Sequence, residues 1–252
     1  MINRNMFFVA NWKMFGRPAY YKILEKVNKY IIRRKKNKGL NIIACVPNTL
    51  LTLYSNKLKK TIIKIGAQNC SQFQNDGPYT GSVSGKMIKD AGAKYVIIGH
   101  SENRKQGDTD KMIKNKIESA FKSGLQIIFC FGETLAEKNK KKTKKVIRNQ
   151  IQKAITNKKF LKKILFAYEP VWSIGSNRIP TTIELNDIIH DIRKFVKSRY
   201  RTNKKIKILY GGSVNFSNIE KLKFINQING YLVGGASQSS KKFIDILKNY
   251  YK

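Results

Sequence analysis

Short apolar runs alternate with longer helical stretches along the whole chain, and this alternation restricts the fold more than any other feature. The short runs are rich in β-branched and aromatic residues: MFFVAN (6–11), NIIACV (41–46), IIKIGAQN (62–69), AKYVIIG (93–99), LQIIFCFG (125–132), KILFAYE (163–169), KIKILYGG (205–212) and GYLVGG (230–235). Between them, helical patterns are found over 19–34, 112–122, 134–155, 181–200 and 239–251. Continuous apolar strands separated by helices predict a parallel sheet covered on both faces.

About eight such units in 252 residues predict an α/β protein with a (β/α)8 barrel, formed as one domain over residues 1–252. The competing doubly wound sheet usually carries an early dinucleotide-binding G-x-G-x-x-G loop, which this sequence lacks. The segment GSVSGKM (81–87) resembles a P-loop, but it has one residue too few between its glycines and Met87 in place of Ser or Thr. A single barrel is therefore the predicted fold.

The chain is strongly basic, with 51 Lys and Arg against 15 Asp and Glu and a formal net charge of +36. The lysines are spread along the chain together with many Asn and Ile, which is the composition that A/T-rich codons produce. The dense runs 33–38 and 138–145 are interpreted as solvated helix faces or helix ends. A nucleic acid partner is therefore not expected, although the charge is consistent with non-specific affinity for polyanions and would attract an anionic substrate.

Cysteine use and hydropathy predict a cytoplasmic, soluble protein. Cys45 and Cys130 lie in apolar runs, which is typical of reduced, buried thiols, and Cys70 leaves an odd number. No segment reaches the ~18 uninterrupted apolar residues of a spanning helix. The N-terminal apolar segment is shorter than the ~7–15 residues of a leader and runs directly into Asn11.

Polar residues gather at the predicted carboxyl ends of the strands, where barrels of this type carry their functional groups. One strand ends at Glu169 because Pro170 cannot donate to a sheet ladder. The other strand ends supply Asn11, Lys13, Gln68, Asn69, His100, Ser101, Cys130, Glu133, YGGS (210–213) and GGAS (234–237). One lysine, one histidine and one glutamate are thus predicted to converge on one face of the barrel.

Each of these residues also has a structural interpretation. Lys13 could be one more surface lysine, His100 could cap the following helix, and the glycine pairs could be ordinary turns. Glu169 could be solvated or paired with a cation. His190, which lies within a helical pattern, is interpreted as structural. Their joint occurrence at strand ends favours a functional site.

The two glycine pairs predict a phosphate site. Backbone N–H groups without side chains can approach an anion closely, and the loops after strands seven and eight commonly bind phosphate in this fold. No Cys, His or carboxylate cluster has metal-ligand spacing. The residues therefore predict acid–base chemistry on a small phosphate monoester, with no metal and no cofactor.

Five segments, in order across the whole chain, resemble the signatures of the triosephosphate isomerase family: ANWKM (10–14), IIGHSENR (97–104), AYEPVWSIG (167–175), YGGSVN (210–215) and LVGGAS (232–237). The resemblance implies interconversion of dihydroxyacetone phosphate and glyceraldehyde 3-phosphate through an enediolate, in glycolysis and gluconeogenesis. It implies Glu169 as the base, His100 as a neutral electrophile, and Lys13 as the positive charge, with Asn11 polarising the substrate. The positions that would grip the phosphate are Gly175, Ser213, Gly234 and Gly235.

The resemblance also implies a mobile lid over about residues 170–180, which would exclude water from the base. The lid tip SIGSNR (173–178) departs from the usual Ala-Ile-Gly-Thr-Gly-Lys. Asn177 replaces a glycine, and Asn tolerates positive φ better than most residues. Phe15 stands where the family commonly has Asn, which predicts only an extra apolar contact.

A homodimer is the further implication, with the loop at about 74–82 inserted into the partner and Thr80 reaching its active site. Ser82 and Asn103 stand where the family usually has Glu and Arg, which would meet across that interface. The paired change predicts that the contact is kept in altered form. The charge of +36 per subunit predicts a salt-dependent dimer.

Two alternatives remain open at this point. One is another sugar-phosphate isomerase on the same barrel, which would need a different lid and pocket. The other is a polyanion-binding protein that has kept the barrel and lost the chemistry. The second predicts loss of Lys13, His100 or Glu169, and all three are present.

Overall fold

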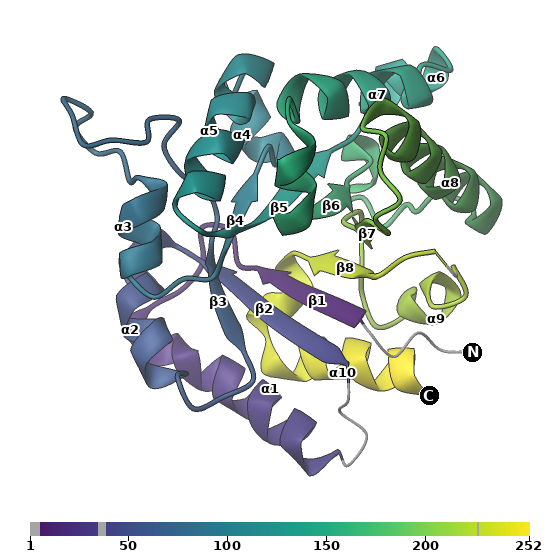
Figure 1. Cartoon of the computed structure of the whole chain (residues 1–252). Coiled ribbons are helices and arrows are strands. Elements are labelled where there is room, and N and C mark those ends of the chain that lie inside the picture. Colours follow the sequence, from purple (N-terminus) through teal and green to yellow (C-terminus); the bar gives the residue numbers. More distant parts are fainter. Residues whose placement is uncertain (1–5, 35–38, 226) are drawn as a thin grey trace.

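The computed structural model describes residues 6–34, 39–225 and 227–252, and in them eight parallel strands form a closed barrel (Figure 1). Each strand pairs with its neighbours in sequence, and β8 pairs with β1 to close the ring. The strands are β1 (Met6–Asn11), β2 (Leu40–Val46), β3 (Lys64–Ala67), β4 (Tyr95–Ile98), β5 (Gln126–Phe131), β6 (Ile164–Tyr168), β7 (Lys207–Tyr210) and β8 (Gly230–Val233). The prediction of a single-domain (β/α)8 barrel is confirmed.

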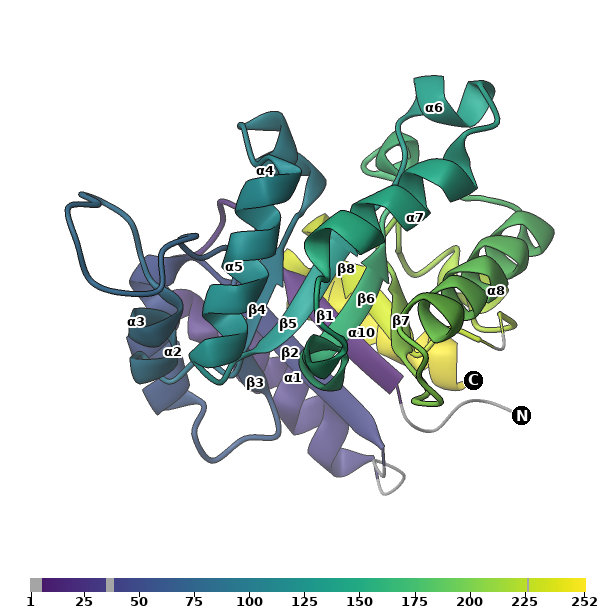
Figure 2. The ribbon, with the colours of Figure 1, turned by 45° about the horizontal axis from the view of Figure 1, so that its top comes forward.

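Helices surround the barrel on its outside (Figures 1 and 2). They are α1 (Tyr21–Arg33), α2 (Leu51–Lys57), α3 (Gly85–Asp90), α4 (Ser101–Lys105), α5 (Asp110–Lys122), α6 (Leu135–Asn139), α7 (Thr143–Ala154), α8 (Thr182–Arg199), α9 (Ile219–Leu222) and α10 (Ser240–Tyr251). Short 3-10 turns are η1 (Pro18–Tyr20), η2 (Asn48–Leu50), η3 (Lys158–Lys163), η4 (Val171–Ser173) and η5 (Gly235–Gln238). Of the basic run 33–38, residues 35–38 lie outside the described residues.

Alternation along the strands produces two apolar cores. Side chains such as Val9, Ile97 and Leu209 fill the inside of the barrel. Their neighbours in the strands, among them Phe8 and Ile98, pack outward against the helices. Because both faces are covered, the strands are apolar throughout, as the sequence pattern indicated.

One helix prediction is wrong, because the pattern over 134–155 forms two helices, α6 and α7. Lys141 adopts a φ of +55°, which no helical residue has. The N–H of Lys142 donates to the carbonyl of Glu137 at 2.9 Å, and the N–H of Lys141 donates to that of Lys138 at 2.8 Å. This pair of bonds is the Schellman ending of a helix, in which glycine normally holds the left-handed position. A lysine holds it here, so the sequence carried no glycine signal for the break.

Candidate active site

Glu169 lies at the mouth of the barrel, where two glycines, Gly132 and Gly211, leave room for it. It follows β6 directly, its backbone N–H donates to the carbonyl of Phe131 at 2.8 Å, and only 3% of the residue is exposed. A Cβ on Gly132 would stand 1.9 Å from the Glu169 carbonyl oxygen, and one on Gly211 would stand 2.6 Å from Glu169 Cγ. A Cβ on Gly212 would meet the hydroxyl of Tyr210 at 2.2 Å. Side chains at these positions would displace the carboxylate or its surroundings.

Burial dominates the acidity of this carboxylate. Desolvation raises the pKa of Glu169, while the electrostatic effect of His100, a hydrogen bond from Cys130 and the charge of Lys13 act in the opposite direction. A higher pKa makes the ionised carboxylate a stronger base than an exposed glutamate. Glu169 is therefore suited to remove a proton from carbon.

His100 acts as a helix cap and faces the cavity at the same time. Its Nδ1 accepts a hydrogen bond of 3.2 Å from the backbone N–H of Glu102, at the start of α4. A ring nitrogen that accepts carries no hydrogen, so the neutral ring carries its hydrogen on Nε2. Nε2 lies 3.6 Å from Oε1 of Glu169. The capping interpretation is therefore confirmed, and the cap fixes which nitrogen faces Glu169.

Lys13 is held in an unusual backbone conformation at the end of β1. Its φ is +56°, and its N–H donates to Asn11 Oδ1 at 3.1 Å. A non-glycine residue with positive φ is strained, and such strain is concentrated at functional sites. The ammonium forms an ion pair with Glu102, a residue to which the sequence analysis assigned no role. The sequence could have indicated Glu102 only through its position, two residues after His100.

The predicted site residues all line one cavity of about 210 Å3, namely Asn11, Lys13, His100, Glu169, Gly175, Ser213, Gly234 and Gly235. Two hydrogen bonds beside this cavity join the segment after β1 to the segment after β8. Trp12 Nε1 donates to the carbonyl of Ser237 at 3.1 Å, and Gln238 Nε2 donates to the carbonyl of Trp12 at 2.8 Å. A Cβ on Gly235 would meet nothing within 4 Å, so its backbone is open to a ligand.

The first turn of the predicted lid is anchored by a second buried carboxylate, Glu133. It accepts hydrogen bonds from Trp172 Nε1 at 2.8 Å and from the hydroxyl of Tyr168 at 3.2 Å. Lys138 covers the Trp172 ring, with its ammonium 3.8 Å from the ring centroid. The sequence placed Glu133 at a strand end but assigned it no role, because the indole that it binds comes from a distant segment.

The lid tip contains two residues with positive φ, Gly175 at +70° and Asn177 at +57°. The expectation that Asn177 tolerates this conformation is confirmed. At the other departure from the family pattern, Phe15 packs edge-on against Trp12, with ring centroids 5.6 Å apart, and against Tyr20. The expected apolar contact is therefore present.

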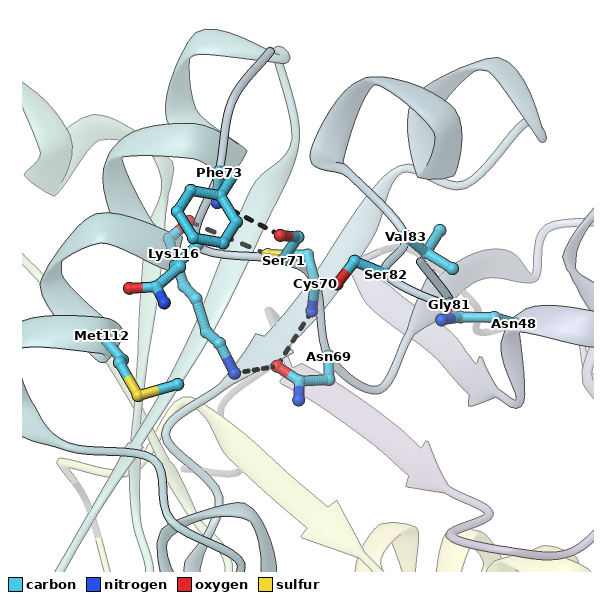
Figure 3. A pocket seen from close by; sticks show the side chains of 11 residues that line it. Asn48, Asn69, Cys70, Ser71, Phe73, Gly81, Ser82, Val83, Met112 and Lys116 are labelled. Atoms are coloured by element: carbon cyan, nitrogen blue, oxygen red, sulfur yellow. Dashed lines mark hydrogen bonds between the residues drawn. The ribbon is translucent and has the colours of Figure 1, made fainter. Parts of the chain in front are cut away.

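A long loop between β3 and α3 projects away from the barrel (Figures 1 and 2). Residues 73–82 are exposed, and the rings of Phe73 and Tyr79 stack on each other with centroids 3.7 Å apart. At its base lies a pocket lined by Ser82 and by Lys116, whose ammonium bonds to Asn69 (Figure 3). Lys116 and Asp108 also form a buried ion pair of 2.6 Å. The base of the loop is thus fixed, whereas its tip makes few contacts with its own barrel.

A further hollow of about 350 Å3 adjoins the active-site cavity on the side of Lys13. Its lining includes Met14, which is fully exposed, and Asn103. In the described ranges, no cluster of three metal-ligating side chains is found. Nor does any helix there have the length and hydropathy needed to cross a membrane.

Closed parallel strands, outer helices and polar groups at the carboxyl strand ends define a (β/α)8-barrel enzyme. The family model described as triosephosphate isomerase matches residues 6–250. Triosephosphate isomerase of Dictyoglomus thermophilum is 41% identical over 251 residues, which cover 98% of this chain and 100% of the relative; that of Geotalea uraniireducens is 37% identical over 97% and 98%. The crystal structure of triosephosphate isomerase from Bartonella henselae matches with a TM-score of 0.88 and 34% identity, covering 98% and 100% of the two chains. The chain belongs to the triosephosphate isomerase family, which are aldose–ketose isomerases.

Proposed function

We propose that the chain interconverts dihydroxyacetone phosphate and glyceraldehyde 3-phosphate at the cavity described above. The observation that carries the proposal is the pairing of a buried carboxylate and a buried imidazole, Glu169 Oε1 and His100 Nε2, 3.6 Å apart on one wall of that cavity. Isomerisation needs a base for the proton on carbon and a donor for the carbonyl oxygen. The two groups supply both.

In the proposed reaction Glu169 removes a proton from the carbon beside the carbonyl and returns it to the neighbouring carbon. The Nε2–H of His100 donates to the carbonyl oxygen while the enediolate forms. Lys13 adds positive charge close to that oxygen. The ion pair with Glu102 orients the Lys13 ammonium, and the hydrogen bond to Asn11 orients the Lys13 backbone. A donor that is oriented before the reaction costs no reorganisation when negative charge develops.

The phosphate is proposed to bind at Gly175, Ser213, Gly234 and Gly235. Support comes from the open backbone at Gly235 and from the position of Gly234, whose added Cβ would lie 3.5 Å from Lys13 Cε. Backbone N–H groups beside an ammonium favour a small dianion. The segment at about 170–180 is proposed to move as a lid, because Gly175 and Asn177 belong to the same cavity wall as Glu169.

A homodimer is part of the proposal. Support comes from the projecting loop at 74–82, from the exposed Met14, and from the hollow beside Lys13 that a second copy of this loop would fill, with Thr80 at its tip. Asn103 lines that hollow and Ser82 lies in the loop, so these two residues are proposed to meet across the interface. A cytoplasmic location is proposed as well, and three cysteines that form no disulfide support it.

The test is isomerisation of glyceraldehyde 3-phosphate by the purified protein over a dilution series, with Glu169→Gln as the matched variant. Removal of a general base is expected to lower kcat by about 10²–10⁴-fold. Activity that falls on dilution would support the dimer. Folded wild-type protein without activity would contradict the proposal, and other sugar phosphates would then be assayed.

A further inference from the structure

Ser173, at the end of the first turn of the lid, has a completely buried side chain. Its hydroxyl lies 3.1 Å from the hydroxyl of Tyr210 and accepts a hydrogen bond of 3.3 Å from the backbone N–H of Ser213. It also donates to the carbonyl of Arg178, at the far end of the lid tip. One small side chain therefore contacts both ends of the lid tip and the segment that follows β7.

These contacts use the whole hydrogen-bonding capacity of a serine hydroxyl, which has one hydrogen to donate and two lone pairs. Because the hydrogen goes to Arg178, the hydroxyl of Tyr210 must be the donor in its contact with Ser173. Tyr210 is itself fully buried. Without the Ser173 oxygen, the buried hydroxyl of Tyr210 would have no acceptor. A buried donor without an acceptor costs more free energy than a donor that can bond to water.

The neighbouring backbone is shaped for this contact. A Cβ on Gly212 would stand 2.6 Å from Ser173 Oγ as well as 2.2 Å from the Tyr210 hydroxyl. Glycine at this position therefore leaves the space in which the two hydroxyls meet. A second link joins the same segments, because Ser213 Oγ donates to Asn177 Oδ1 at 3.4 Å.

We propose that Ser173 is a positioning residue for the isomerase reaction, which holds the lid against the segment 210–213 and so sets the separation between Gly175 and Ser213. This inference rests on the proposed function, since Gly175 and Ser213 are two of the proposed phosphate positions. Glu169 lies four residues before Ser173 and packs on Gly211 of the same segment. Ser173 thus fixes the lid to the surface on which the base rests.

The test compares Ser173→Ala with Ser176→Ala. Ser176 is a matched control, because its hydroxyl bonds only within the lid, to the carbonyls of Trp172 and Ser173 and to the N–H of Arg178. Loss of the Ser173 hydroxyl is expected to lower kcat/KM about three- to tenfold, in line with one lost net hydrogen bond. Binding of 2-phosphoglycolate, a phosphate monoester whose carboxylate carries the charge of the enediolate, should weaken by a similar factor. Hydrogen exchange of the amides in 173–178 should become faster.

Kinetics and exchange indistinguishable from those of Ser176→Ala would overturn the proposal. So would a loss of activity that follows a loss of folded protein while KM and phosphoglycolate affinity stay unchanged, because a purely structural role produces that result. A double-mutant cycle with Tyr210→Phe gives an independent check, since the two losses should not add, and full additivity would contradict the link. If the wild type proves inactive, the proposed function fails, and hydrogen exchange in the two serine variants still decides whether Ser173 holds the lid against the segment 210–213.

Discussion

At the scale of single residues, the burial of Glu169 has opposite effects on activity and on stability. A carboxyl whose pKa is raised in the folded state favours folding below its ordinary pKa of about 4.5, and that contribution is lost as the pH rises through the raised value. At neutral pH the folded protein must hold a buried charge. The buried carboxylate therefore lowers the stability of the folded protein at neutral pH, while the same burial strengthens it in its proposed role as a base.

Glu169→Gln is expected to raise the melting temperature at pH 7, because the neutral amide removes the buried charge. The gain should disappear near pH 4, where the wild-type carboxyl is protonated in both states. Thermal unfolding of both proteins across this range measures the effect. An unchanged or lower melting temperature of the variant at pH 7 would show that the carboxylate is better stabilised by its neighbours than by water.

The same raised pKa determines the acid limb of the activity profile. Because the proposed base must be ionised, kcat/KM is expected to fall as the pH decreases through the pKa of Glu169, at a pH above the 4.5 of an ordinary glutamate. The profile of kcat/KM between pH 4 and pH 8 reports this value for the free enzyme. A limb at or below 4.5 would assign the titration to a different group or would indicate that burial does not dominate.

A substitution at Gly235 is expected to change substrate binding without changing the stability of the fold. Gly235→Ala should leave the free energy of unfolding nearly unchanged, because an added Cβ meets nothing within 4 Å, yet KM should rise since the methyl group would enter the proposed phosphate position. Gly230→Ala is the contrasting variant, as its Cβ would stand 2.1 Å from the carbonyl oxygen of Phe7 in the barrel wall. That variant should lose stability. Unchanged KM in Gly235→Ala would move the phosphate away from this loop.

At the scale of elements, the structure shows how far a sequence pattern extends. Apolar runs located all eight strands to within about two residues, because burial on both faces leaves a continuous signal. The break between α6 and α7 was not predictable, since it depends on a left-handed lysine rather than on a glycine. The glycines of YGGS were interpreted as backbone for an anion. The additional reason for Gly211 and Gly212, room for Glu169, Tyr210 and Ser173, depends on tertiary contacts that no local pattern records.

Lys141→Gly should stabilise the protein, because it removes the strain of a side chain at positive φ, which costs about 1 kcal/mol. Lys26→Gly is the matched control in the exposed interior of α1, where glycine should cost about 1 kcal/mol. Urea unfolding of both variants measures the two effects. Equal destabilisation by both substitutions would mean that the Lys141 backbone carries no strain.

At the scale of the whole molecule, charge is the dominant property. Nine ion pairs of a lysine or arginine with a carboxylate are found among the described residues, and they use only part of the 51 basic side chains. Two subunits with a charge of +36 each repel one another over a distance that salt shortens, about 8–10 Å at physiological ionic strength. The proposed dimer should therefore depend on salt.

Sedimentation between 10 and 300 mM salt (roughly the range over which the screening length falls several-fold) should show dimers that become tighter as salt increases. Tight dimers at the lowest salt would contradict this prediction.

A gel-shift series with a random-sequence oligonucleotide over the same salt range measures the affinity of the protein for polyanions. Any binding should be lost steeply as salt rises and should show no sequence preference.

The two thiols inside the barrel have a consequence for chemical modification. Cys45 and Cys130 are completely buried, and burial raises the pKa of both thiols, so neither presents a thiolate to a reagent while the barrel is closed. Alkylation at these positions can then proceed only as fast as the strands separate. The labelling rate of Cys45 and Cys130 under native conditions, without denaturant, should therefore measure how often the barrel opens.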